Sequence, residues 1–135
     1  MKYHVKSEGP NQKGFLKGLE HAIKIAIDNG SNEVALAVHS KSNLSGTIQD
    51  VLDETFVKQL KKDGVINYKG IKIFLLTEKI QSGFESGVIL ACHASGRYLV
   101  KLINDYRATD IVYVPWHPDE VAAYLEKYDS QEIVL

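Results

Sequence analysis

Three histidines follow apolar runs of the chain, and each precedes a helical pattern: His39, His93 and His117. Each apolar run predicts a buried strand that turns into a helix at its carboxyl end. The carboxyl ends of parallel strands meet at one edge of an open sheet, where ligands bind. We therefore expect the three imidazoles to lie around one cleft. The runs that precede them are Val34–Val38, Val88–Cys92 and Ile111–Val114.

These imidazoles suggest two kinds of chemistry. Three histidines with an open position are a known catalytic zinc arrangement, and a single histidine can act as a general acid or base on an anionic substrate. No His-Glu-x-x-His motif is present, and Asp119, two residues after His117, does not by itself orient an imidazole. The sequence thus predicts no metal site, but a hydrolase or lyase using His39, His93 and His117, with or without zinc, remains an alternative.

A polar loop at residues 40–47 leaves the first of these strands and opens a helix. Its hydroxyls, its glycine and the helix amino terminus would point hydrogen-bond donors into one space, and its lysine would add a positive charge. This pattern favours an anion such as phosphate, although its spacing is not the Walker pattern. Plain capping of the helix is the alternative. The candidate ligand-binding residues are Ser40, Lys41, Ser42, Ser45, Gly46 and Thr47.

A second Ser-Gly helix start follows His93. Ser95 would cap the helix, Gly96 would let a ligand approach the backbone, and Arg97 offers a bidentate fork for phosphate or carboxylate. Farther on, Trp116 could form an aromatic wall for a ring, or it could simply pack against the adjacent helix. We count all four residues as ligand-binding candidates.

Nucleophilic catalysis has weaker support in the sequence. Ser45 and Ser95 are each followed by glycine, but no Gly-x-Ser-x-Gly elbow occurs. Cys92 ends an apolar run, where a lone cysteine is usually a small buried hydrophobe. The sequence therefore leaves open whether the protein is an enzyme.

Helices and strands alternate along the chain, which predicts a parallel sheet covered on both faces. The expected class is a three-layer, open, mainly parallel α/β sheet of Rossmann-like type, formed by residues 1–135 as one domain. A long irregular stretch, residues 77–87, is a candidate lid or binding loop. Expected helices cover residues 11–29, 47–63, 95–106 and 118–128, and expected strands cover 33–38, 71–76, 88–92 and 111–114, with short strands at 2–6, on an edge, and 132–135.

The amino-terminal half resembles the carboxyl-terminal domain of pyruvate kinases. The resemblance rests on the runs His21–Ala26 and Glu33–His39, followed by Ser40-Lys41-Ser42 and by Ser45-Gly46-Thr47 at a helix start. Free-standing small proteins of similar fold and unknown function also exist. The resemblance implies this fold and a phosphate-ligand site in the 40–47 loop. It does not imply phosphotransfer to or from pyruvate, and this chain departs from the motif by inserting Asn43-Leu44-Ser45 before the glycine.

Composition excludes several classes of protein. With 16 Lys+Arg against 17 Asp+Glu, the chain has a net charge of −1 and no electrostatic signature of nucleic-acid binding. It lacks a signal-like or membrane-spanning apolar run, and its single cysteine suits a reducing compartment. We expect a soluble, cytoplasmic protein without cofactor that binds an anionic small molecule as a ligand-binding or sensing domain. A non-catalytic homo-oligomer, pairing through an edge strand at residues 2–5 or 133–135, is a further alternative.

Overall fold

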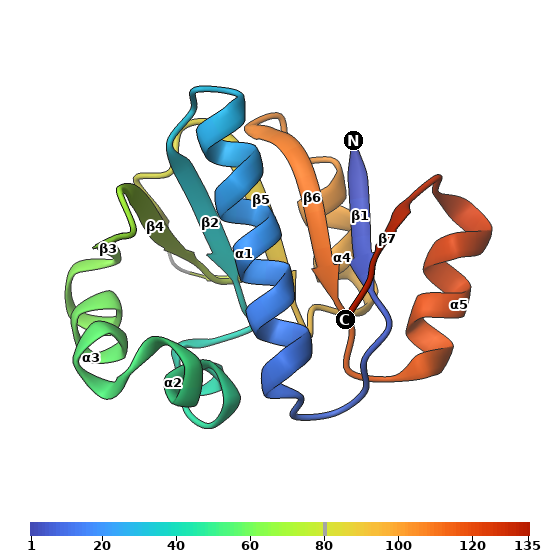
Figure 1. The fold of residues 1–135 in the computed structure, drawn as a ribbon, viewed down its shortest axis with the longest axis horizontal. Coiled ribbons are helices and arrows are strands. Elements are labelled where there is room, and N and C mark those ends of the chain that lie inside the picture. The colour runs from blue at the N-terminus through green and yellow to red at the C-terminus, as the bar shows by residue number, and fades with distance from the viewer. Residues whose placement is uncertain (80) are drawn as a thin grey trace.

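A single mixed sheet forms the centre of the computed structural model, which describes residues 1–79 and 81–135 (Figure 1). Within those residues the strand order is β3-β4-β2-β5-β6-β1-β7. All neighbouring strands run parallel except β3 and β4, which form an antiparallel hairpin. The strands are β1 (Lys2–Val5), β2 (Glu33–Ala37), β3 (Val65–Tyr68), β4 (Ile71–Leu76), β5 (Gly87–Cys92), β6 (Ala108–Val114) and β7 (Gln131–Ile133).

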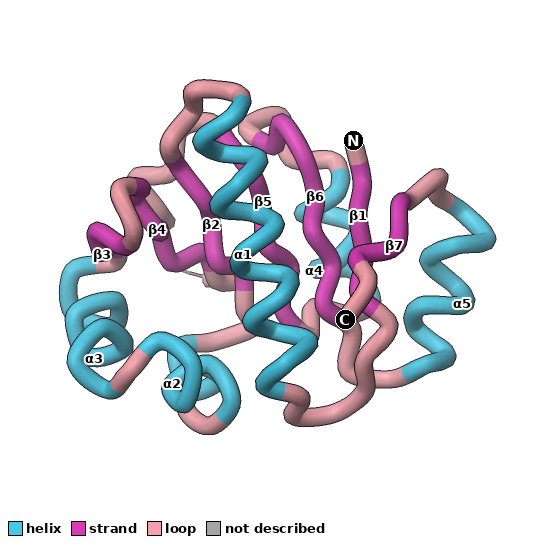
Figure 2. Tube along the Cα trace, viewed as in Figure 1, coloured by secondary structure: helices cyan, strands magenta, loops and turns pink. Residues whose placement is uncertain are grey.

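Helices cover both faces of this sheet, as Figure 2 shows. One core joins β-strand side chains to α1, α2 and α3, and a second core on the other face includes side chains of α4 and α5. No helix in the described part of the chain is long and apolar enough to cross a membrane. The helices are α1 (Gln12–Asp28), α2 (Thr47–Leu52), α3 (Glu54–Asp63), α4 (Gly96–Ile103) and α5 (Pro118–Lys127), with a 3-10 turn, η1 (Lys41–Leu44).

The predicted fold class, a three-layer and mainly parallel α/β sheet, is confirmed. Three details of the prediction are wrong. The expected helix over 47–63 is two helices, because Asp53 has a φ of +85° that cannot continue a helix and its carboxylate instead accepts from the Glu54 N–H at 2.7 Å. The amino-terminal strand β1 is not an edge strand, because it lies between β6 and β7. The four-residue strand β3 was not predicted.

The alternation of side chains along β2 determines which face the residue after it occupies. Leu36 and Val38 belong to the core beneath α1, whereas Ala35 and Ala37 belong to the core beneath α4. Since successive side chains of a strand point to opposite faces, His39 continues the row of the two alanines. His39 therefore lies on the α4 face of the sheet, just beyond its carboxyl edge.

Candidate functional site

The three strand-end histidines leave the carboxyl edge side by side, because β2, β5 and β6 are neighbours in the sheet. Their imidazoles nevertheless have different surroundings. His39 contacts Glu78 and Ser95, His93 packs against the ring of Trp116, and His117 caps its own helix. The three strands thus end next to one another, as expected, but the printed contacts do not place the three imidazoles around one cleft: each has its own partners, and of the three only His39 joins two other reactive groups.

His39 lies between a carboxylate and a serine. Its Nδ1 contacts Oε1 of Glu78, and its Nε2 accepts a hydrogen bond from the backbone N–H of Ser95 at 3.2 Å. Because Nε2 accepts, the hydrogen-bond network assigns the ring proton to Nδ1, which donates it to the carboxylate. The side chain of His39 is 34% exposed, so the ring is supported on both sides and still open to solvent.

Ser95 occupies the N-cap position of α4, as predicted, but its side chain does not cap that helix within the described structure. Its Oγ lies 3.5 Å from Nε2 of His39. The capping role expected from the sequence is therefore wrong for this hydroxyl. The result is a carboxylate, an imidazole and a hydroxyl in one row, the order that an orienting group, a base and a nucleophile require.

Tyr98 forms the floor of this row. Its ring centroid lies 5.1 Å from that of His39, and its hydroxyl donates to the carbonyl oxygen of Leu76 at 3.1 Å. Burial, reinforced by the nearby charge of Glu78, raises the pKa of the Tyr98 phenol well above its ordinary value. Tyr98 is thus a neutral hydrogen-bonded support for the imidazole.

An open cleft of about 280 Å³ lies in front of α4. It adjoins a second cleft of about 440 Å³ along the segment after β4, with which it shares Glu78, Tyr98 and Lys101. Arg97 and Lys101 make no salt bridge within the described residues, and both line this cleft together with the carboxylate of Glu78. The charge of Lys101 also helps to lower the pKa of Asp105. The first cleft is lined by Glu78, Ser95, Arg97, Tyr98 and Lys101.

His93 and Trp116 form a separate aromatic pair. Their ring centroids lie 4.8 Å apart in an edge-on arrangement, and burial lowers the pKa of His93. The backbone of His93 has a φ of +58°, and its N–H donates to the Val114 carbonyl oxygen at 2.7 Å. The preceding Cys92 is fully buried, which raises the pKa of its thiol to about 12 and makes it a poor nucleophile.

His117 has a local role at the start of α5. Its Nδ1 accepts from the Asp119 N–H at 3.1 Å, and its own backbone N–H donates to the Glu120 carboxylate at 2.9 Å. Pro118 fills the first helical position, as predicted. The Trp116 side chain is 48% exposed beside it, so the aromatic wall predicted there faces solvent near His93 rather than the cleft before α4.

The predicted anion loop at residues 40–47 lies on the opposite face of the sheet from α4. Its η1 and α2 residues pack into the core beneath α1, with Leu44 and Ile48 buried there. The Ser40 hydroxyl bonds the Ser42 hydroxyl at 2.8 Å and Oδ1 of Asn43 at 3.1 Å. Gly46, not a serine or threonine, is the N-cap of the six-residue α2. The two Ser-Gly helix starts therefore share an edge of the sheet but not a face.

Lys41 is the one member of this loop that lines a described cleft. That cleft, of about 270 Å³, lies beside α3 and also contains Lys61 and Lys62. Lys61 reaches back to the Ser45 hydroxyl at 3.4 Å. Lys41 and Lys62 are exposed and Lys61 is half-buried, and the lining of this cleft includes no serine or threonine of the loop. The role of Ser40, Lys41, Ser42, Ser45, Gly46 and Thr47 in ligand binding stays a prediction.

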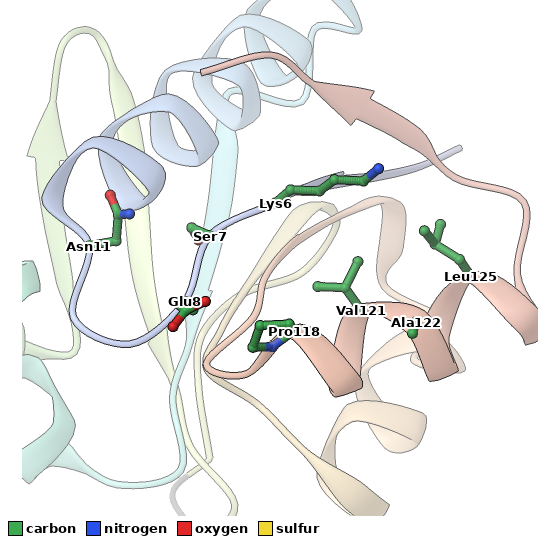
Figure 3. A pocket seen from close by; sticks show the side chains of 8 residues that line it. All are labelled: Lys6, Ser7, Glu8, Asn11, Pro118, Val121, Ala122 and Leu125. Carbon is green, nitrogen blue, oxygen red and sulfur yellow. The ribbon is translucent and has the colours of Figure 1, made fainter.

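A cavity of about 540 Å³ lies elsewhere on the carboxyl edge, between the segment after β1 and α5 (Figure 3). One wall is apolar, formed by Val121 and its neighbours on α5. On the other wall, Lys6 pairs with Glu132 at 3.2 Å, and the Asn11 amide oxygen accepts from α1 at 2.8 Å. The Ser7 hydroxyl in this lining is buried and has no hydrogen-bond partner in the described structure. None of the three strand-end histidines lines this cavity.

Zinc chemistry finds no support in the arrangement of side chains. No group of three or more His, Cys, Asp or Glu residues in the described part of the chain could hold a metal ion. His39 and Glu78 alone supply too few ligands for a protein zinc site.

Glu78, Tyr98 and Lys101 were not predicted as site residues. Glu78 adjoins His39 because β2 and β4 are neighbours and Ala37 pairs with Leu76, so the residues two positions farther on lie side by side. Only the strand order reveals this register. Tyr98 and Lys101 stand three and six residues after Ser95, a helical spacing that the sequence does contain.

The chain matches no protein-family model, no curated protein and no solved structure. The resemblance to the pyruvate kinase carboxyl-terminal domain is therefore a prediction that no relative tests.

Proposed function

We propose that this protein binds a small molecule carrying a phosphate or carboxylate, in the cleft before α4 at the carboxyl edge of the sheet. The observation that carries the proposal is the presence in one cleft of the open start of α4 and of two cations, Arg97 and Lys101, that form no salt bridge in the described structure. Backbone N–H groups of a first helical turn have no partner within the helix, and they favour negative charge. Arg97 adds the planar fork that suits both anions.

The α4 side supports this proposal better than the 40–47 loop does. In that loop the hydroxyl of Ser40 is occupied by Ser42 and Asn43, and α2 has only six residues. Before α4 the Ser95 hydroxyl caps nothing within the described structure, and Gly96 leaves its backbone uncovered. The resemblance to the pyruvate kinase domain would instead favour the loop, so an experiment must separate the two places.

Titration of the ¹⁵N-labelled full chain with glycerol phosphate, inorganic phosphate and succinate provides that separation. We expect the amide signals of Gly96 and Arg97 to move with saturation, and the melting temperature to rise with ligand concentration. Arg97→Gln should weaken binding about 10-fold or more, because hydrogen bonds to charged groups are the stronger ones.

Lys41→Gln is the matched control, since it removes one cation from the opposite face. It should leave binding unchanged. Saturable shifts confined to Ser42, Gly46 and Thr47, abolished by Lys41→Gln, would move the site to the other face. Absence of saturable shifts with all three anions at millimolar concentration would overturn the proposal.

A further inference from the structure

Ser95, His39 and Glu78 are joined through one imidazole, and this row goes beyond what anion binding requires. We infer that these residues are the nucleophile, general base and orienting carboxylate of a site that hydrolyses small carboxylic esters. The assignment of an anionic substrate rests on the proposed function, whereas the assignment of the three residues rests on their own geometry.

The hydrogen-bond partners of His39 favour the tautomer that a general base needs. Its Nδ1 proton is directed to Glu78, which leaves the lone pair of Nε2 directed to Ser95. The floor of Tyr98 and the contact with Glu78 hold the ring in this orientation. Such a row is recognised by its geometry and not by the order of its members along the chain.

The hydroxyl of Ser95 is available to react. It makes no capping bond within the described structure, and its Oγ is 3.5 Å from Nε2. Hydrogen bonds between catalytic groups are often this long without substrate and shorten when a substrate excludes water. Nε2 accepts from the Ser95 backbone N–H in this structure, so the catalytic step requires the Ser95 hydroxyl to replace that N–H as the donor.

The start of α4 supplies stabilisation for negative charge beside this hydroxyl. The first intrahelical bond of α4 runs from the Leu99 N–H to the Ser95 carbonyl oxygen at 3.4 Å. The N–H groups of Gly96 and Arg97 come before it and would donate to the oxyanion of a tetrahedral intermediate. Gly96 has a φ of +56°, a conformation that keeps side-chain bulk away from this point.

The reaction is balanced with water as the second substrate. Oγ of Ser95 bonds to the ester carbonyl carbon while its proton passes to Nε2 of His39. The carbon–oxygen bond to the leaving alcohol then breaks, and the alcohol takes that proton, which leaves an acyl group on Ser95. Water attacks the acyl carbon and gives a proton to Nε2, and Ser95 recovers a proton as the carboxylic acid departs.

The cleft indicates which esters would fit. Its volume of about 280 Å³ suits a small acyl group, and Arg97 and Lys101 favour one that carries a second, negative group. A dicarboxylic half-ester has this chemistry. We therefore name small anionic carboxylic esters as the substrate class.

Hydrolysis of mono-4-nitrophenyl adipate by the full chain tests the inference, with 4-nitrophenyl hexanoate as the matched neutral ester. Ser95→Ala and His39→Gln should each lower kcat at least about 100-fold. Glu78→Gln should lower it about 10-fold. Acid-quenched wild-type protein should carry an acyl adduct on the peptide that contains Ser95. Ser86→Ala, an exposed serine outside the site, is the control and should match the wild type.

The outcomes separate this inference from the proposed function. Wild-type rates in folded Ser95→Ala and His39→Gln, or no adduct on Ser95, would overturn the catalytic assignment even if anions bind. Equal kcat/KM for the two esters, combined with loss of activity in Ser95→Ala, would keep the catalytic row and reject the anionic substrate. Melting temperatures of the variants, measured alongside, show whether a lost activity reflects lost folding.

Discussion

The starts of α2 and α4 have the same short sequence, a serine followed by glycine after a buried strand, yet they differ in structure. At α2 the polar groups of the preceding loop bond one another, and Gly46 itself is the cap. At α4 the serine hydroxyl is directed to an imidazole from another strand. The comparison shows that the same Ser-Gly helix start has a different environment depending on which side chain a neighbouring strand places beside the serine.

The face of the sheet explains why the two starts differ. Side chains of α2 pack beneath α1, a long helix that fills the space before β2 on that face. The α4 face has Ala35, Ala37 and Ala91 in its core, and these small side chains leave room for Tyr98 against His39. Steric room on one face thus allows a histidine, a tyrosine and a serine to meet there.

The largest expected effect is in the reactivity of the two serines. Treatment of the folded chain with a fluorophosphonate should label Ser95 about 10³-fold faster than Ser45, because only Ser95 has an imidazole base within reach. Peptide mapping by mass spectrometry measures both rates in one sample. Equal labelling, or labelling that persists in His39→Gln, would remove the distinction between the two helix starts.

Replacement of the glycine should destabilise the fold more at the start of α2 than at the start of α4, which reverses the order expected for serine reactivity. Gly46 has φ +85° and ψ −125°, a region almost closed to other residues, so Gly46→Ala should lower the free energy of unfolding by about 2–3 kcal/mol. Gly96 has a φ of +56°, where alanine costs about 1 kcal/mol and asparagine less. Urea unfolding of the Ala and Asn variants measures both. A larger loss at Gly96 than at Gly46 would contradict this order.

Much of the fold could be predicted from the sequence, because buried strands and amphipathic helices leave strong local patterns. The α/β class, the positions of β2, β4 and β5 and the start of α5 at Pro118 follow from such patterns. The short strand β3 and the break at Asp53 left no such pattern, since β3 is defined by its pairing with β4 and the break by a single unusual φ angle. The neighbours of β1 depend on strand order.

The site was harder to predict because its contacts also depend on strand order and not on local sequence patterns. His39 and Ser95 were candidates from the sequence, but their contact joins two strands and a helix. Glu78 became a partner only through the β2–β4 register, which no local pattern contains. Conversely, His93 and His117 had the same local signal as His39, and the structure gives them different partners. Local patterns locate an edge of a sheet but do not assign partners across it.

The pH dependence of stability should come from three histidines that are buried or half-buried, His4, His21 and His93. Burial is the main cause that lowers the pKa of His4, His21 and His93 below the ordinary value of 6.5. The unfolded chain therefore binds protons more readily than the folded one as pH falls. The contribution of these histidines to the free energy of unfolding should be at its full value above about pH 6.5 and should decrease as the pH falls below that value.

Urea midpoints between pH 5 and pH 8 measure this decrease. His93→Asn should make it smaller, and asparagine tolerates the φ of +58° at that position. A midpoint that rises as pH falls through this range would contradict the assigned direction.

The smallest expected effect concerns the contribution of the Ser95 hydroxyl to folding. Ser40→Ala, which breaks the hydrogen bonds of this hydroxyl to Ser42 and Asn43, should lower the free energy of unfolding by about 1 kcal/mol. Ser95→Ala should cost less than about 0.5 kcal/mol, because its hydroxyl makes no capping bond in the described structure. Urea unfolding of both variants, with Ser86→Ala as the surface reference, resolves this difference. If Ser95→Ala cost as much as Ser40→Ala, a contribution to stability alone would account for the Ser95 hydroxyl, and the distinction between the two helix starts would be lost. If Ser95→Ala costs little, the Ser95 hydroxyl that faces His39 lies at a position where folding does not require a hydroxyl.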